Sequence, residues 1–271
     1  MTTTTTLIAA AQLESSPSAE ENLAKARSAI ALAAQRGARL VILPEIFLAY
    51  LSHEEFTAFH ARQVAQSLDG PFVRGLREAA RAAQVWVVAG MIETASESEE
   101  KTYNTTVVID EQGQLLRAYH KTHMFDAYGY RESDVFVSGD RLFEPLETPF
   151  GRMGLFVCYE LRFPEVARYQ AARGVDFFVV PSGWVNGHLK EVHWRHLVVA
   201  RAIENTAYVF TCDQAGHQFL GRSLHVDPLG VVLAEGHEGE QLVFGELDRQ
   251  RLEQARARVP SLQHRRPDLY G

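Results

Sequence analysis

The stretch from residue 7 to residue 45 reads LIAAAQLESSPSAEENLAKARSAIALAAQRGARLVILPE, and it decides the fold class. It begins and ends with short apolar runs, 7–13 and 40–43, in which polar and apolar residues hardly alternate. Strands that are covered on both faces have this composition. Between the runs, Ser18 is a good helix N-cap, and apolar residues recur at helical intervals until Gly37 can end the helix. The stretch therefore predicts a strand–helix–strand unit of a layered α/β domain.

The same unit recurs farther along the chain. Helical patterns precede strand-like apolar runs at three places, 72–83 before 86–91, 165–173 before 177–180, and 191–205 before 208–212. Two hairpins are predicted as well, with turns at 111–113 between the arms 105–109 and 115–119, and at 228–230 before the arm 231–233. Because no linker or repeat divides the sequence, we expect one mixed α/β domain over residues 1–271 with helices outside buried sheets.

Composition and charge exclude several classes of protein. With 46% hydrophobic and 23% charged residues, the 271-residue chain is typical of globular proteins and not of disordered ones. A net charge of −7 without a dense basic stripe argues against nucleic-acid binding, and the apolar runs are too short to cross a membrane. Two cysteines cannot form a disulfide framework, and residues 1–6 do not resemble a secretory signal, so we expect a cytoplasmic protein.

Polar residues end three of the predicted strands. Cys158 follows the apolar residues 154–157, and Glu45 and Lys121 each follow another run. Functional groups often gather at the carboxyl ends of strands, because loops and helix N-termini converge there. A cysteine beside a base and a cation is a candidate nucleophile. The alternative is that Cys158 is a small core residue, as we expect for Cys212, and that Glu45 and Lys121 are solvated loop residues.

Five segments resemble the nitrilase superfamily of carbon–nitrogen hydrolases, whose signature is a glutamate, a lysine and a cysteine on separate strand ends. They are LPE at 43–45, YHKTHMFD at 119–126, GLFVCYELRFPE at 154–165, RAIEN at 201–205 and HRRPDLY at 264–270. These segments come in the family's order and span almost the whole chain. One departure is Glu160, which stands where many relatives have aspartate. Because the charge is kept, the change bears on local packing more than on catalysis.

The resemblance implies a covalent mechanism in which Cys158 attacks the carbonyl carbon of an amide and forms a thioester. It assigns Glu45 as the base that accepts the thiol proton and later activates water. It assigns Lys121 and the main-chain N–H of Tyr159 to the oxyanion, and Glu132, a short distance beyond the lysine, as a second glutamate that orients the amide. No cofactor is implied.

The resemblance also implies an α-β-β-α four-layer sandwich. Members of the family pair through a large interface, so we expect a homodimer or higher oligomer, with the C-terminal tail 256–271 crossing to the partner. A small-molecule amide is the only other partner expected.

The branch that the motifs resemble contains ω-amidase and deaminated-glutathione amidase, which cleave small linear amides carrying a distal carboxylate. Such a substrate needs a cation in the pocket, and Arg162, Lys190 and His193 are candidates by position. Trp184 is a candidate for the pocket wall. For each charged residue the alternative is a structural ion pair or a solvated charge, and for Trp184 it is a place in the core.

Two other classes of function are compatible with the same sequence. A nitrilase or an N-carbamoyl amidohydrolase shares the three signature residues and differs in its pocket, and a non-catalytic relative would keep only the fold. A metal enzyme is disfavoured, because His120 and His123 lie three apart on a strand and loop and no Cys/His pairing completes a site. We therefore expect no metal.

Overall fold

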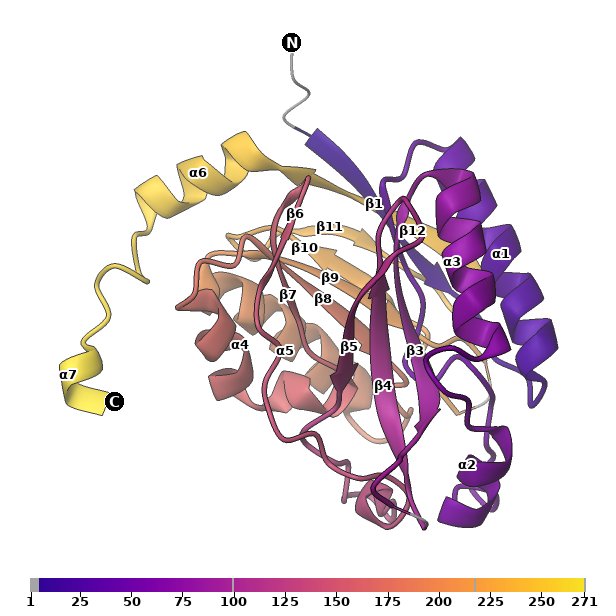
Figure 1. The fold of residues 1–271 in the computed structure, drawn as a ribbon. Helices are drawn as coiled ribbons and strands as arrows, with labels where there is room; N and C mark the ends of the chain where they lie inside the picture. The colour runs from indigo at the N-terminus through magenta and orange to yellow at the C-terminus, as the bar shows by residue number, and fades with distance from the viewer. Residues whose placement is uncertain (1–4, 99, 217, 271) are drawn as a thin grey trace.

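Two six-stranded sheets face each other in the computed structural model, and helices cover the outer face of each sheet (Figure 1). The structure describes residues 5–98, 100–216 and 218–270, so residues 1–4 of the threonine-rich N-terminus lie outside it. The covering helices are α1 (Ala19–Gln35) and α3 (Pro71–Ala83) on the first sheet, and α4 (Pro164–Ala171) and α5 (Lys190–Asn205) on the second. This is the predicted α-β-β-α sandwich.

The strand order of the first sheet is β12-β1-β2-β3-β4-β5 and that of the second is β11-β10-β9-β8-β7-β6. The first sheet contains β1 (Thr5–Gln12), β2 (Leu40–Ile42), β3 (Trp86–Thr94), β4 (Thr102–Ile109), β5 (Leu115–His120) and β12 (Gln241–Asp248). The second contains β6 (Leu146–Thr148), β7 (Gly151–Leu155), β8 (Phe177–Ser182), β9 (Tyr208–Asp213), β10 (Leu224–Val226) and β11 (Val232–Glu235). In each sheet three neighbouring strands are parallel, β1 to β3 and β7 to β9, so their carboxyl ends share one edge.

Local sequence explains the ends of α1. The Ser18 side chain accepts a hydrogen bond from the Glu21 backbone N–H at 3.3 Å, as an N-cap does. The Glu21 carboxylate does not complete the capping box and accepts instead from the Ser16 hydroxyl at 2.7 Å. At the other end, Gly37 has φ 91°, a left-handed conformation that costs glycine little. The helix therefore begins and ends at the predicted residues.

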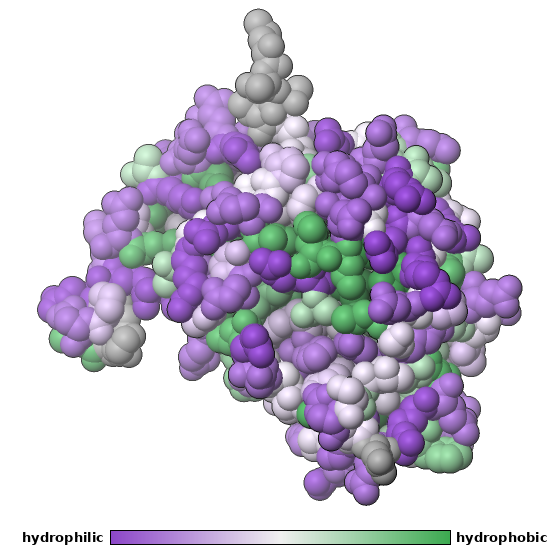
Figure 2. Space-filling model, in the orientation of Figure 1, coloured by the Kyte–Doolittle hydropathy of each residue, from purple (hydrophilic) through white to green (hydrophobic). Residues whose placement is uncertain are grey.

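The apolar strands are buried on both faces, as predicted. Along β1, Ile8 and Ala10 belong to the core between the two sheets, whereas Ala9 and Ala11 pack with the helices outside the first sheet. Side chains alternate between the faces of a strand, so only an apolar residue at nearly every position satisfies both layers. In Figure 2 apolar side chains gather in a band across the middle of the visible face, where the two sheets meet, with hydrophilic residues around it.

Several elements had no clear signal in the sequence. These are the edge strands β6 and β12, the helices α2 (Ala58–Val64), α6 (Arg249–Arg258) and α7 (Pro267–Tyr270), and the short helices η1 (Glu132–Asp134) and η2 (Cys158–Arg162). Among the described strands, β12 pairs with β1 alone and is partly exposed, so its sequence lacks the continuous apolar run of the central strands. The two predicted hairpins are present as β4–β5 and β10–β11.

The C-terminal segment leaves the body of the domain after α6 (Figure 1). Arg256, the first residue of the predicted tail 256–271, still belongs to α6 and is held by its own subunit, because the guanidinium contacts the Asp176 carboxylate at 2.8 Å and the Val175 carbonyl at 2.6 Å. Any crossing of the tail to a partner therefore begins beyond α6 and stays a prediction. Among the described helices, none is long and apolar enough to cross a membrane.

Candidate active site

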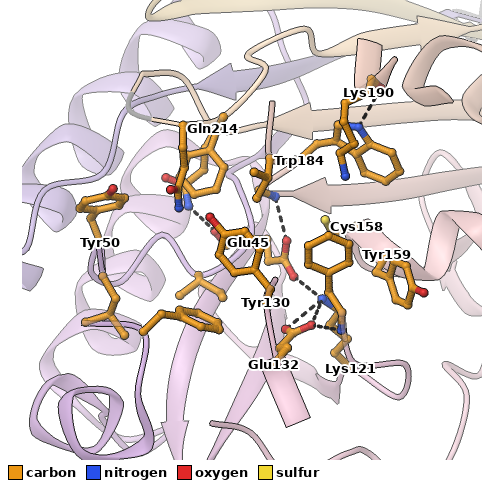
Figure 3. Close-up of a pocket in the computed structure, with 18 of the residues that line it drawn as sticks. Glu45, Tyr50, Lys121, Tyr130, Glu132, Cys158, Tyr159, Trp184, Lys190 and Gln214 are labelled. Atoms are coloured by element: carbon orange, nitrogen blue, oxygen red, sulfur yellow. Dashed lines mark hydrogen bonds and ion pairs between the residues drawn. The ribbon is translucent and has the colours of Figure 1, made fainter. Parts of the chain in front are cut away.

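The three polar strand ends meet at one place (Figure 3). Glu45 follows β2, Lys121 follows β5, and Cys158 begins η2 after β7. Lys121 Nζ donates to Glu45 Oε1 at 2.9 Å and to Glu132 Oε1 and Oε2 at 2.9 and 2.7 Å. Glu132 comes from η1, in the loop after β5. The structure thus brings together all four residues that the resemblance assigned to catalysis.

Hydrogen bonds from the second sheet hold both the side chain and the main chain of Glu45. Its Oε2 accepts from the Gly183 N–H at 2.8 Å, and its main-chain carbonyl accepts from Gln214 Nε2 at 2.8 Å. On the first sheet, a Cβ at Gly90 would lie 2.6 Å from Glu45 Cα, so glycine is needed there for the close approach of β3. Both sheets therefore hold Glu45.

Burial and charge set the protonation of the site. Burial lowers the pKa of Lys121, but Glu132, Glu45 and Cys158 outweigh it and raise that pKa above the ordinary value, so the lysine is a permanent cation. The pKa of Glu132 is raised by burial and by Glu45, with Lys121 opposing. The pKa of Cys158 is raised by burial, by the charge of Glu45 and by a hydrogen bond to Glu45, with Lys121 opposing. Burial therefore keeps the Cys158 thiol of the free site protonated.

Glu160 joins the segment of Lys121 to the segment of Cys158. Its Oε1 accepts from the Tyr119 hydroxyl at 2.7 Å and from the Thr122 backbone N–H at 2.8 Å. Its Oε2 accepts from the Val157 backbone N–H at 2.7 Å. Cys158 itself has φ 45°, a left-handed conformation that costs a non-glycine residue about 1–3 kcal/mol and persists only where its surroundings enforce it. We infer that the glutamate at this position supports that conformation.

An aromatic pocket leads to Cys158. Among the described residues, the aromatic side chains that line it are Tyr50, Phe56, Phe125, Tyr130, Tyr159, Trp184 and Phe219. They come from loops at the shared edge of both sheets. The pocket therefore gives a small molecule access to the thiol between mostly apolar walls.

The sequence model of the carbon–nitrogen hydrolase family matches residues 7–257. The chain belongs to the carbon–nitrogen hydrolase family. The deaminated glutathione amidase of Synechocystis is 38% identical over 272 residues, which cover 96% of this chain and 97% of the relative. Omega-amidase NIT3 of Saccharomyces cerevisiae is 32% identical over 269 residues, which cover 95% of this chain and 91% of the relative.

Solved structures agree with this membership. Nit3 of Saccharomyces cerevisiae, a member of branch 10 of the nitrilase superfamily, superposes with a TM-score of 0.85 at 30% identity, covering 97% of each chain. A variant of the Nesterenkonia sp. AN1 amidase superposes with a TM-score of 0.80 at 26% identity, covering 98% of this chain and 95% of that one. That variant carries the acetamide moiety of fluoroacetamide covalently on its active-site cysteine. The nitrilase-like fold expected from the motifs is confirmed.

Of the four candidate substrate-binding residues in this carbon–nitrogen hydrolase, Lys190 and Trp184 line the pocket. Arg162 and His193 are absent from the described lining and contact each other at 3.3 Å, and the Arg162 guanidinium lies 5.0 Å from the centre of the Trp184 ring. Their positions fit the alternative of a structural pair. The sequence could not separate the four, because whether they reach the pocket depends on how the loop after β8 packs.

Lys190 is buried against aromatic rings and faces the pocket (Figure 3). Its Nζ lies 4.4 Å from the centre of the Trp184 ring and 4.8 Å from that of Phe125. No hydrogen bond or ion pair joins this Nζ to any other residue in the described part of the chain. Burial lowers the pKa of Lys190, and the charges of Cys158 and Asp213 oppose that effect.

Two residues of the site were not predicted from the sequence. Asn104, on β4, donates to Glu45 and Glu132, and Asp213, at the end of β9, accepts from the Trp184 backbone N–H at 2.7 Å. Each is a fully buried polar residue on a strand, and burial raises the pKa of Asp213. A polar residue inside an apolar run was the available signal. It does not reveal which residues the side chain will meet.

In residues 5–98, 100–216 and 218–270, no group of three or more His, Cys, Asp or Glu side chains is arranged to bind a metal ion. His120 is engaged otherwise, since its Nε2 lies 3.0 Å from Glu93 and its ring stacks on Tyr103. Cys212 is fully buried, and burial raises the pKa of its thiol.

Proposed function

We propose that this carbon–nitrogen hydrolase is an amidase with Cys158 as its nucleophile. The observation that carries the proposal is one contact set: the Lys121 ammonium joins Glu45 and Glu132, and Cys158 lines the same pocket as these three residues. Because burial raises the pKa of the thiol, attack near neutral pH needs a base in contact with it. Glu45 is that base.

In the first step, Cys158 Sγ bonds to the amide carbon while Glu45 takes the thiol proton. The carbonyl electron pair moves to oxygen, and Lys121 and the Tyr159 N–H stabilise the resulting oxyanion. Lys121 donates two hydrogen bonds to Glu132, so one N–H can turn to the oxyanion while the ion pair persists. A donor of this kind contributes about 3–4 kcal/mol to transition-state stabilisation.

The carbon–nitrogen bond then breaks. Glu45 returns its proton to the leaving nitrogen, ammonia departs, and the acyl group stays on Cys158 as a thioester. Water, deprotonated by Glu45, attacks the thioester, and the thiolate leaves and recovers its proton. Glu132 keeps Lys121 and the substrate amide oriented throughout. The balance is one amide and one water converted into one acid and one ammonia.

We propose further that the substrate is a small linear amide with a carboxylate at its other end, such as the ω-amide of a dicarboxylate. Lys190 supports this, because its ammonium faces the pocket with rings around it and forms no hydrogen bond or ion pair with a carboxylate in the described structure. A substrate carboxylate would supply the missing counter-charge. The names of the relatives from Synechocystis and yeast agree with this class.

An ammonia-release screen tests the proposal. The panel contains α-ketoglutaramate, neutral amides of the same length, nitriles and N-carbamoyl amino acids. We expect turnover of the carboxylate-bearing amide, and with added hydroxylamine we expect part of the acid to be replaced by the hydroxamate, since a thioester is open to a stronger nucleophile. Turnover without hydroxamate would refute the thioester. Strong turnover of nitriles or carbamoyl compounds would move the enzyme to those classes.

We also propose that two copies pair through α5. Apolar side chains are exposed there and on the neighbouring hairpin, at Val192, Ile203, Val231 and Leu233. Light scattering after gel filtration tests this: we expect a dimer for the whole chain and a monomer for Ile203→Glu. A monomeric parent protein would contradict it.

A further inference from the structure

Asn104 lies between the two carboxylates of the site. It sits on β4 directly beside Lys121, whose backbone N–H donates to the Asn104 carbonyl at 2.9 Å. Its side-chain Nδ2 donates to Glu45 Oε1 at 2.8 Å and to Glu132 Oε1 at 2.9 Å. The Lys121 ammonium bonds the same two oxygens, each at 2.9 Å. One amide and one ammonium therefore bridge the same pair of carboxylates.

The orientation of the Asn104 amide is fixed by charge. If the amide were flipped, its carbonyl oxygen would face two carboxylate oxygens and both hydrogen bonds would be lost. In the observed orientation the Oδ1 atom is buried and has no hydrogen-bond partner among the residues that the structure describes. A buried acceptor without a partner carries a free-energy cost, so the contacts of Nδ2 must outweigh it.

We propose that Asn104 is a positioning residue of this hydrolase: it holds Glu45 and Glu132 as two separate, ionised carboxylates around Lys121, so that Glu45 keeps an oxygen directed at the Cys158 thiol. The inference rests on the proposed function of Glu45 as the base. Two close carboxylates otherwise tend to share one proton, and a carboxylate that holds this proton cannot accept another from the thiol.

The groups around this pair come from both sheets. Lys121, which follows β5, opposes protonation of the Glu45 and Glu132 carboxylates. Cys158 from η2 and Asp213 from β9 face Glu45 from the other sheet. Asn104 does not line the pocket. Its removal should therefore change kcat and the pH profile and leave KM nearly unchanged.

The experiment compares Asn104→Ala and Asn104→Asp with the matched control Thr106→Val. Thr106 lies two residues along the same strand, is fully buried, and its hydroxyl has no hydrogen-bond partner in the described part of the chain. For both Asn104 variants we expect kcat to fall about 10- to 100-fold, as for loss of a hydrogen bond to a charged group. The acid limb of the kcat/KM profile should move to higher pH, because a carboxylate without its donor protonates more readily. The control should keep the parent profile.

A second readout does not depend on the substrate. In a Cys212→Ser background, the rate of Cys158 alkylation by iodoacetamide is measured against pH, and its acid limb should shift in the same direction in the Asn104 variants. Unchanged profiles, or an equal fall in kcat for Thr106→Val, would overturn the proposal. If Asn104→Ala does not fold, the pH profiles of Asn104→Asp, which keeps the size of the side chain, test the proposal by themselves. A shifted alkylation profile in a protein that cleaves no amide would refute the proposed function and leave the role of Asn104 intact.

Discussion

Replacing Lys121 by methionine tests whether the cluster of charges is as tightly coupled as its geometry indicates. The Lys121 side chain is only 2% exposed, and its three hydrogen bonds all go to the carboxylates of Glu45 and Glu132. Methionine has nearly the same length and no charge. Lys121→Met thus leaves two buried carboxylates facing each other without a cation, while the packing volume changes little.

The expected cost follows from burial. Removing one partner of a buried ion pair costs about 3–5 kcal/mol, because the remaining charge is uncompensated. At roughly 2 °C per kcal/mol for a domain of this size, the melting temperature should fall by about 6–10 °C at pH 8. A surface pair of the same length is the control: Lys25 contacts Glu240 at 2.9 Å, but its side chain is 39% exposed. Lys25→Met should cost less than about 1 kcal/mol.

The cost of Lys121→Met should depend on pH with a definite sign. The pKa of Glu132 is already raised by burial and by Glu45, and loss of Lys121 removes the group that opposes this rise. A carboxyl whose folded-state pKa lies above its unfolded value destabilises the fold at high pH, and it ceases to do so as pH falls through the folded pKa. The stability difference from the parent protein should therefore shrink between pH 8 and pH 5.

Differential scanning calorimetry of the parent, Lys121→Met and Lys25→Met at both pH values measures these differences. A drop in melting temperature no larger than that of Lys25→Met would refute the reasoning. So would a large drop that is the same at pH 8 and pH 5, because it would come from packing and not from unpaired carboxylates.

Three further predictions follow from individual contacts. Cys158→Ala should abolish ammonia release while circular dichroism and melting stay near those of the parent, whereas Cys212→Ser should keep its turnover; an active Cys158→Ala protein would contradict the assignment. Lys190→Met should raise KM about 30-fold or more for an amide with a distal carboxylate, in line with loss of a buried charge partner, and leave a neutral amide unaffected. Equal effects on both amides would contradict a role in binding the carboxylate. Glu160→Gln should lower stability by about 1–3 kcal/mol, because the amide places a donor against backbone N–H groups. Burial raises the pKa of Glu160, but hydrogen bonds from His123 and Thr122 lower it overall. The contribution of Glu160 to the free energy of unfolding is therefore present above pH of about 4.5 and is lost as pH falls through the lowered pKa. A stability difference between parent and variant that grew on acidification would contradict this.

Most of the fold could be predicted from the sequence, because its signals are local. The apolar run of β1, the N-cap at Ser18 and the glycine at position 37 each act within a few residues, and together they determine a strand and a helix. The nearly continuous apolar strands also required cover on both faces. The edge strand β12 and the helix α6 lacked such signals, because partly exposed elements tolerate many residue types.

The sequence by itself determined that Glu45, Lys121 and Cys158 stand at strand ends, and the family motifs joined them into one hypothesis. Only the tertiary structure decided which other side chains reach them. It brought Asn104 to both carboxylates and Lys190 to the pocket, and it paired Arg162 with His193 outside the described pocket lining. The physical reason is that these contacts join strands and loops far apart in the chain, so the direction of each side chain depends on how the two sheets pack and on no pattern within its own segment.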